Sequence, residues 1–163
     1  MIIRVLLPLA VTMAAWCGAA LAQVYGQLGD AAPDVDDPDL LRAYFGAIQS
    51  LNAAGRLLAY HDRADGGLLA TVSEMLFAGR QGVSLQLDNL GDDVLASLFN
   101  EELGAVIQVR EEQKSDVMNV LRENGLGACS HIIGKLNDRD EIEFTRDAKI
   151  IYNAARVHLR RAW

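Results

Sequence analysis

The stretch Leu57–Leu69 reads LLAYHDRADGGLL and decides how the middle of the chain folds. Its apolar start predicts a short buried strand over 57–60, and the polar turn that follows contains two adjacent glycines, Gly66 and Gly67. A helix is predicted to begin near Leu68, because apolar residues recur at helical spacing from there on. The turn therefore lies beyond the carboxyl end of a strand, where α/β proteins usually bind ligands.

This turn has the chemistry of a phosphate site. The first N–H groups of a helix lack partners within the helix, and the helix dipole is positive there. Gly66 and Gly67 would let a ligand approach the backbone, and Asp62 offers Mg²⁺ a carboxylate that phosphate oxygens and water would complement. The alternative is structural, with Asp65 as a helix cap and the glycines as a tight turn. An EF-hand calcium loop does not fit, because Ser73 stands where the loop that starts at Asp62 requires glutamate.

The segments on both sides predict an α+β layered domain. Asp37 and Pro38 are typical of a helix start, and Gly55 is placed to end that helix. Further elements follow in this order: a strand over 82–87, a helix over 92–100, a strand over 105–109, a helix over 111–124, strands over 129–136, 141–145 and 149–152, and a helix from 154. We expect a mixed, largely antiparallel sheet that is partly ferredoxin-like.

Composition limits the classes of function. The chain has 163 residues, of which 51% are hydrophobic and 23% charged, so it can bury one core. Its formal net charge of −7 argues against a general partner among nucleic acids or anionic membranes, because such surfaces need an excess of Lys and Arg. A small phosphate ligand stays possible, since backbone N–H groups can hold one.

Other candidate residues favour structural roles. The two cysteines, Cys17 and Cys129, cannot make a disulfide framework or a complete zinc site, and Cys129 is expected to be a buried thiol. His131 is expected to pack on a strand. In Asn100–Glu102, the two glutamate side chains are expected to point in different directions, because neighbouring helix residues are about 100° apart. This favours a structural or interface role over shared acid–base catalysis. The basic tail is expected to be a solvated helix end rather than a phosphate site; it contains Arg156, His158, Arg160 and Arg161.

The stretch Met1–Ala22 has the outline of a secretory signal peptide. It reads MIIRVLLPLAVTMAAWCGAALA, with an early Arg4, an apolar run and a small-x-small ending at residues 20–22. A transmembrane helix is less favoured, because Pro8 and Gly18 interrupt the run. Cleavage after Ala22 would make the protein an exported one.

Several long blocks resemble one enzyme family. YHDRADGGL at 60–68 resembles the YHDRSDGGL signature of the large, single-chain phosphoribosylformylglycinamidine synthases. The blocks GDDVLASLFNEELGAVIQVR at 91–110 and SEMLFAG at 73–79 resemble further segments of these enzymes. GAALAQVYGQLGD at 18–30 and the tail RVHLRRAW at 156–163 extend the resemblance over nearly everything from Gly18 onward, so only residues 1–17 would be foreign.

The resemblance implies a domain division. The chain would be the C-terminal half of the second aminoimidazole-ribonucleotide-synthetase-like unit of such an enzyme. Residues 1–17 would be a foreign or signal-like leader, 18–39 a helix remnant and acidic linker, 40–153 the synthetase-like C-terminal domain, and 154–163 the start of a linker to a glutaminase domain that is missing.

The resemblance also implies a function and a site. The family uses ATP and glutamine to convert formylglycinamide ribonucleotide to the amidine in purine biosynthesis. Asp62 would be a magnesium ligand of bound ATP or ADP, and Ala64, Gly66 and Gly67 would contact the nucleotide. Ala64 replaces a family serine, which removes one hydrogen bond worth about 0.5–1.5 kcal/mol. His61 would support the site without taking part in catalysis.

Alternatives differ in class and location. The isolated chain is expected to be an inactive, cytoplasmic fragment whose partners are the nucleotide and the missing domains, because the glutaminase and the other magnesium-binding acids are absent from it. A second hypothesis is an exported, non-catalytic binding domain that keeps the same fold. Aminoimidazole ribonucleotide synthetase itself is a third. Apolar surface left uncovered by missing domains would favour self-association.

Overall fold

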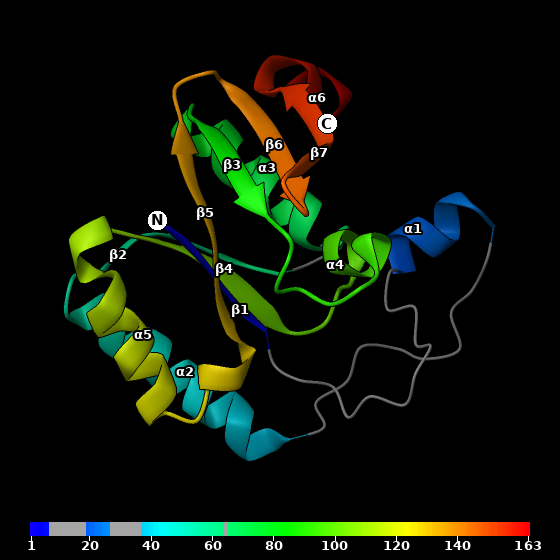
Figure 1. Cartoon of the computed structure of the whole chain (residues 1–163). Helices are drawn as coiled ribbons and strands as arrows, with labels where there is room; N and C mark the ends of the chain where they lie inside the picture. Colours follow the sequence, from blue (N-terminus) through cyan, green and yellow to red (C-terminus); the bar gives the residue numbers. More distant parts are fainter. Residues whose placement is uncertain (7–18, 27–36, 64) are drawn as a thin grey trace.

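A computed structural model describes residues 1–6, 19–26, 37–63 and 65–163 of the chain. Within them, strands form one seven-stranded sheet in the order β2-β4-β1-β5-β3-β6-β7, and all neighbours are antiparallel except the parallel pair β3 and β6 (Figure 1). The strands are β1 Ile2–Leu6, β2 Leu57–Asp62, β3 Gly82–Gln86, β4 Gly104–Val109, β5 Ser130–Asn137, β6 Glu141–Arg146 and β7 Lys149–Ala155. The helices are α1 Ala19–Val24, α2 Pro38–Ala53, α3 Gly67–Gly79, α4 Val94–Phe99, α5 Lys114–Glu123 and α6 Arg156–Ala162, with 3₁₀ turns at Glu111–Gln113 and Gly127–Cys129.

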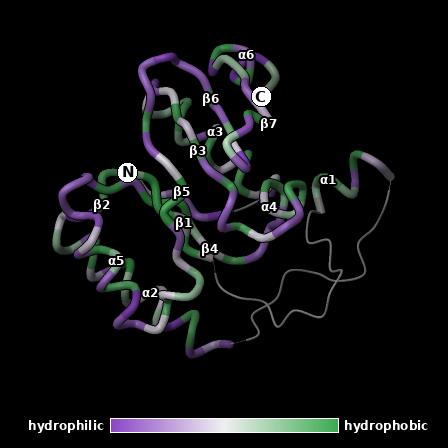
Figure 2. The backbone as a smooth tube through the Cα atoms, in the orientation of Figure 1, coloured by the Kyte–Doolittle hydropathy of each residue, from purple (hydrophilic) through white to green (hydrophobic). Residues whose placement is uncertain are grey.

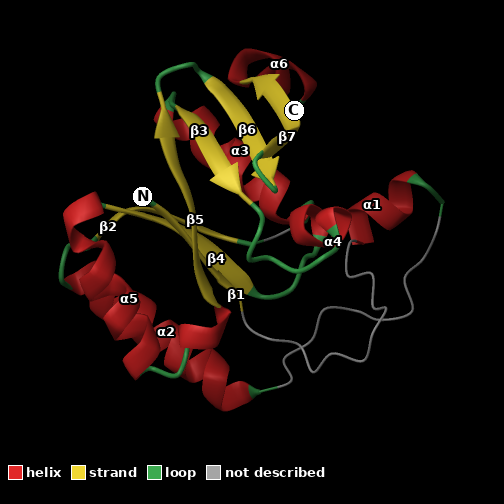
Figure 3. Ribbon diagram, in the orientation of Figure 1, coloured by secondary structure: helices red, strands yellow, loops and turns green. Residues whose placement is uncertain are grey.

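Helices cover both faces of the sheet. Figure 3 shows α2 and α5 on one side, with α3, α4 and α6 on the other. Successive strand residues point to opposite faces, so Ile3 and Ile107 pack toward α2 and α5, while Ile2 and Val106 pack toward α3. Hydrophobic residues gather along the central strands β1 and β4 (Figure 2). The predicted α+β class with a mixed, largely antiparallel sheet is confirmed.

The centre of the sheet contains a strand that sequence analysis missed. Strand β1 lies between β4 and β5, and Ile3 and Val5 are fully buried. The sequence pattern predicts a foreign or signal-like leader over 1–17, because a short apolar run looks the same in a leader as in a central strand. Residues 7–18 lie outside the described residues, and the boundary at residue 17 stays a prediction.

The elements next to the turn largely follow their sequence signals. Asp37 caps α2, since its Oδ1 accepts hydrogen bonds from the N–H groups of Asp39 and Leu40. Strand β2 is present, but its predicted burial is wrong. Strand β2 lies at an edge of the sheet, where β4 is the one strand that pairs with it among the described residues. Its residues therefore alternate between half-buried and exposed.

The C-terminal half has the predicted order of elements with shifted bounds. The helix expected over 111–124 starts with a 3₁₀ turn and becomes α-helical at Lys114. Strand β7 continues to Ala155, so the last helix starts later than predicted. None of the helices in the described parts of the chain is long and apolar enough to cross a membrane.

Candidate functional site

Asp62 is the last residue of β2, directly before the glycine turn. Its side chain is 73% exposed, so the carboxylate faces solvent and is not taken up by the core. The N–H of Arg63, the next residue, donates to the carbonyl of Gly104 at 2.8 Å, so backbone pairing with the start of β4 continues one residue beyond the strand. An exposed carboxylate at this place is available to a cation.

The glycine turn is shaped by its protein neighbours. Gly66 and Gly67 have φ values of 81° and 65°, in the left-handed region that favours glycine. A Cβ on Gly67 would lie 2.6 Å from the carbonyl oxygen of Leu98 and 2.8 Å from that of Asn100. The close approach predicted for a ligand is therefore made, at Gly67, by the end of α4. Ala64 lies outside the described residues.

Glu101 closes this turn from the loop that follows α4. The carboxylate is buried, and its Oε1 accepts hydrogen bonds from the N–H groups of Gly66 at 2.9 Å and Ala20 at 3.1 Å. A carboxylate at the start of α3 is favoured by the helix dipole. This is the structural role that we expected for Asn100–Glu102, and it engages the Gly66 amide that a phosphate would otherwise contact.

Arg63 is a buried residue of the site that sequence reasoning did not single out. Its guanidinium Nη2 donates to the carbonyl of Asn100, which ties the turn to the same loop that carries Glu101. The sequence offers one signal, a lone arginine between two aspartates in a glycine-rich turn, but its partner is far away in the chain.

His61 and Glu74 form a pair beside the turn, on the α3 side of the sheet. The Nε2 atom of His61 lies 2.7 Å from Oε2 of Glu74, and its Nδ1 lies 2.6 Å from the carbonyl oxygen of Asp62. Hydrogen-bond acceptors therefore face both ring nitrogens and fix the orientation of the ring. The sequence predicts a supporting role for His61 but gives no sign of its partner, Glu74.

A cavity of about 590 Å³ opens between α3 and the strands β2 and β4. Its walls are mainly apolar, with Val72 and Met75 among them, and the polar groups of His61, Glu74 and Gln108 line it as well. Asp62, Gly66 and Gly67 do not line it. These three predicted site residues are therefore not part of the cavity wall, although His61 next to Asp62 is.

Other candidates take structural positions. No group of three His, Cys, Asp or Glu side chains gathers to hold a metal within the described parts of the chain. Cys129 is a buried thiol in the 3₁₀ turn before β5, and burial raises its pKa. In the basic tail, Arg156 pairs with Asp140 at 2.5 Å, and Arg160 lies over the ring of Phe77.

Comparison with known proteins places this arrangement among known folds. A family model described as AIR synthase related protein, C-terminal domain, matches residues 14–147. The fold is similar to that of Thermotoga maritima PurL complexed with FGAR, with a TM-score of 0.76 and 14% identity over 97% of this chain and 27% of that chain. T. maritima PurL complexed with ATP has a TM-score of 0.71 and 16% identity, over 77% and 22%.

A hydrogenase maturation protein shares the fold. E. coli HypE is similar with a TM-score of 0.61 and 20% identity, over 88% of this chain and 45% of that chain. At these identities the likeness concerns the fold alone. The chain spans less than half of the length of each of these structures.

Proposed function

Because this chain belongs to the family of AIR synthase related proteins, through their C-terminal domain, we propose that it contributes part of a magnesium–nucleotide site to an ATP-using, ligase-like enzyme. We further propose that this enzyme is a phosphoribosylformylglycinamidine synthase. It would convert formylglycinamide ribonucleotide to formylglycinamidine ribonucleotide with ATP and glutamine. The resemblance of 60–68 and 91–110 to that enzyme supports this choice over other members of the family.

The position of Asp62 carries the proposal. The carboxylate is exposed at the end of a strand, and the turn after it leads into the N-terminal end of α3. Magnesium in nucleotide sites takes one or two carboxylates and completes its shell with phosphate oxygens and water. A single exposed aspartate fits that requirement, and the family's other acidic ligands would come from the rest of the enzyme.

The residues of the turn would then have separate roles. Asp62 would hold Mg²⁺, which neutralises phosphate charge when it is bound. Gly66 and Gly67 would keep the turn in its left-handed conformation, with the Gly66 N–H already engaged by Glu101. Phosphate contacts would fall to the later amides of the first turn of α3. Ala64 would face the nucleotide without the hydroxyl of the family serine.

Activity would need more than this chain. Glutamine hydrolysis and the remaining magnesium ligands are proposed to lie in other domains, which would also be the chain's partners in the cytoplasm. We therefore expect no turnover from the isolated chain with ATP, glutamine and formylglycinamide ribonucleotide.

Isothermal titration of the full chain with ADP in the presence of Mg²⁺ tests the site. Asp62→Asn removes the metal-binding charge and keeps the side-chain shape, so nucleotide affinity is expected to fall by about tenfold or more. The control is Asp138→Asn, which makes the same charge change in the exposed turn between β5 and β6.

Equal affinity for Mg-ADP in the wild type and in Asp62→Asn would remove the proposed role of Asp62. A similar loss in Asp138→Asn would show a general charge effect and not a metal ligand. Binding that is unchanged when Mg²⁺ is withdrawn would argue against a metal-dependent site.

A further inference from the structure

Strand β2 is an open edge of the sheet. Among the described residues its backbone pairs with β4 alone, and its sequence LLAYHD contains neither lysine nor proline. Open edges can add another strand, and proteins commonly block them with such residues. The opposite edge, β7, begins with Lys149.

Grooves flank β2 on both faces of the sheet. On one side, a groove of about 370 Å³ runs between β2 and α2, with Tyr44 and Phe45 in its lining. On the other side lies the cavity of about 590 Å³ beside α3. Leu58 and Tyr60 line both the groove and the cavity. A strand added next to β2 would place alternate side chains in the two grooves, because strand side chains alternate between faces.

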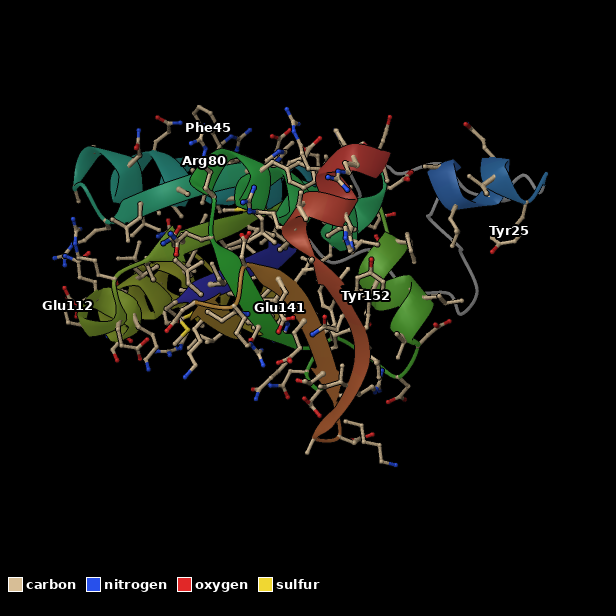
Figure 4. All side chains as sticks on the ribbon, turned by 90° about the horizontal axis from the view of Figure 1, so that it is seen from above. Tyr25, Phe45, Arg80, Glu112, Glu141 and Tyr152 are labelled. Atoms are coloured by element: carbon tan, nitrogen blue, oxygen red, sulfur yellow. The ribbon has the colours of Figure 1, made fainter. Side chains whose placement is uncertain are left out.

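Apolar side chains surround this edge. Phe45 is 63% exposed, Leu58 45% and Tyr60 43%. Figure 4 shows Phe45 projecting from α2 to the outside of the molecule. Neighbouring exposed apolar side chains next to unpaired backbone are typical of a surface that another strand covers.

The charges at the two ends of β2 specify the occupant. Arg56 directly precedes the strand and Asp62 ends it, and both side chains are partly or largely exposed. Each also has a contact within the chain: Arg56 Nη1 lies 3.5 Å from Oδ2 of Asp116 on α5, and Asp62 Oδ1 lies 3.7 Å from Nδ1 of His61, so the dimer contact would add to these pairs or exchange with them.

Two copies of β2 in antiparallel pairing, centred on Ala59, place Arg56 of each copy opposite Asp62 of the other. Leu58 then faces Tyr60 across the strands, a favourable pairing of an aliphatic with an aromatic side chain. A parallel arrangement would oppose like charges.

We propose that the chain forms a two-fold dimer in which the β2 strands of two copies pair edge to edge. The contact is self-complementary and closed, as two-fold interfaces are. The other edge does not offer this match, because β7 starts at Lys149 and is followed by Arg156, so two antiparallel copies would oppose basic residues. The proposal does not rest on nucleotide binding, but the two proposals share Asp62, so pairing of its carboxylate with Arg56 of a second copy would compete with Mg²⁺.

Sedimentation equilibrium of the full chain over a concentration series, up to roughly 100 µM, measures the dimer. Leu58→Lys and Arg56→Asp are each expected to weaken association at least about tenfold. Combining Arg56→Asp with Asp62→Arg exchanges the charges and is expected to restore the dimer. Ile150→Lys makes the matched change on the exposed face of β7 and is expected to leave it intact. Circular dichroism identifies variants that fail to fold, and these are excluded.

A wild type that stays monomeric over the whole series would overturn the proposal. So would an association that Ile150→Lys abolishes and Leu58→Lys does not, because it would place the contact at the other edge. A folded double variant that stays as weak as Arg56→Asp alone would rule out the antiparallel register.

Discussion

The carboxylate of Glu101 and the backbone N–H of Gly66 are joined by a 2.9 Å hydrogen bond, although 35 positions separate the two residues in the chain. The same Oε1 atom accepts from Ala20, so one carboxylate links the start of α1, the glycine turn and the loop after α4. Because it lies at the positive end of α3, it holds the turn that carries the candidate nucleotide residues. The geometry of the glycine turn therefore depends on Glu101, a residue far from it in the sequence.

Removing this carboxylate should loosen the turn. Glu101→Ala leaves the Gly66 N–H without its acceptor, and we expect the free energy of unfolding to fall by about 1–3 kcal/mol. Glu101→Gln keeps an acceptor oxygen and should cost less. Urea denaturation measures both, with the exposed Glu123→Ala as the control. A loss from Glu101→Ala no larger than that of the control would show that the bond contributes nothing.

Gly67→Ala should be among the most damaging small substitutions. The new Cβ meets backbone of Leu98 at 2.6 Å, and the left-handed φ adds strain. Gly55→Ala separates these effects, because Gly55 has a φ of 63° with open space around its Cβ position. We expect Gly67→Ala to lower the unfolding free energy by about 1–3 kcal/mol more than Gly55→Ala. Equal losses would mean that the end of α4 can shift without cost.

Ile3→Ala tests whether β1 is part of the core. Ile3 is fully buried on the face of the sheet that α2 and α5 cover, so its truncation should lower the free energy of unfolding by about 2–5 kcal/mol. Ile150→Ala makes the same chemical change on an exposed strand and should be nearly neutral. Thermal unfolding of the two variants, side by side, reports the difference. Similar midpoints would place residues 2–6 outside the stable fold.

A shortened chain of residues 23–163 distinguishes the two hypotheses for the N-terminus. Cleavage after Ala22 would remove β1, so this chain is expected to lack a cooperative unfolding transition. An exported and processed form would then be unable to keep this sheet. A shortened chain that unfolds cooperatively at the midpoint of the full chain would support the exported alternative.

The thiol of Cys129 should be protected and should favour the folded state below alkaline pH. Burial raises its pKa, so the unfolded chain ionises first as pH rises. Its contribution to stability is therefore full below the ordinary thiol pKa and is lost as pH rises through the folded value. In a Cys17→Ser background, labelling by a thiol reagent should be slow in the native protein and fast in urea. Fast labelling without denaturant would contradict this.

Local signals predicted local structure. Asp37 and Pro38 marked the start of α2, and the run at 57–60 marked a strand that is present. The strand–turn–helix around Gly66 was also predicted, because turn residues and helical periodicity act over a few positions. The α+β class followed from the order of these elements.

Long-range partners were beyond the sequence patterns. The parallel pairing of β3 with β6, the bond of Arg63 to Asn100 and the pair of His61 with Glu74 depend on which distant segments meet. Strand β1 was missed for a related reason, since nothing within 2–6 says that β4 and β5 will flank it. The edge position of β2 likewise depends on what the rest of the sheet leaves uncovered.

The place of β1 also sets the order in which the protein can assemble. Ile2 pairs with Gln108 on one side and with Gly134 on the other, so ribosomes release residues 2–6 long before their neighbours are made. Contacts this far apart form slowly and leave apolar segments exposed while they wait. The sheet can therefore close only after β5 has been synthesised, and until then its central strand lacks a neighbour.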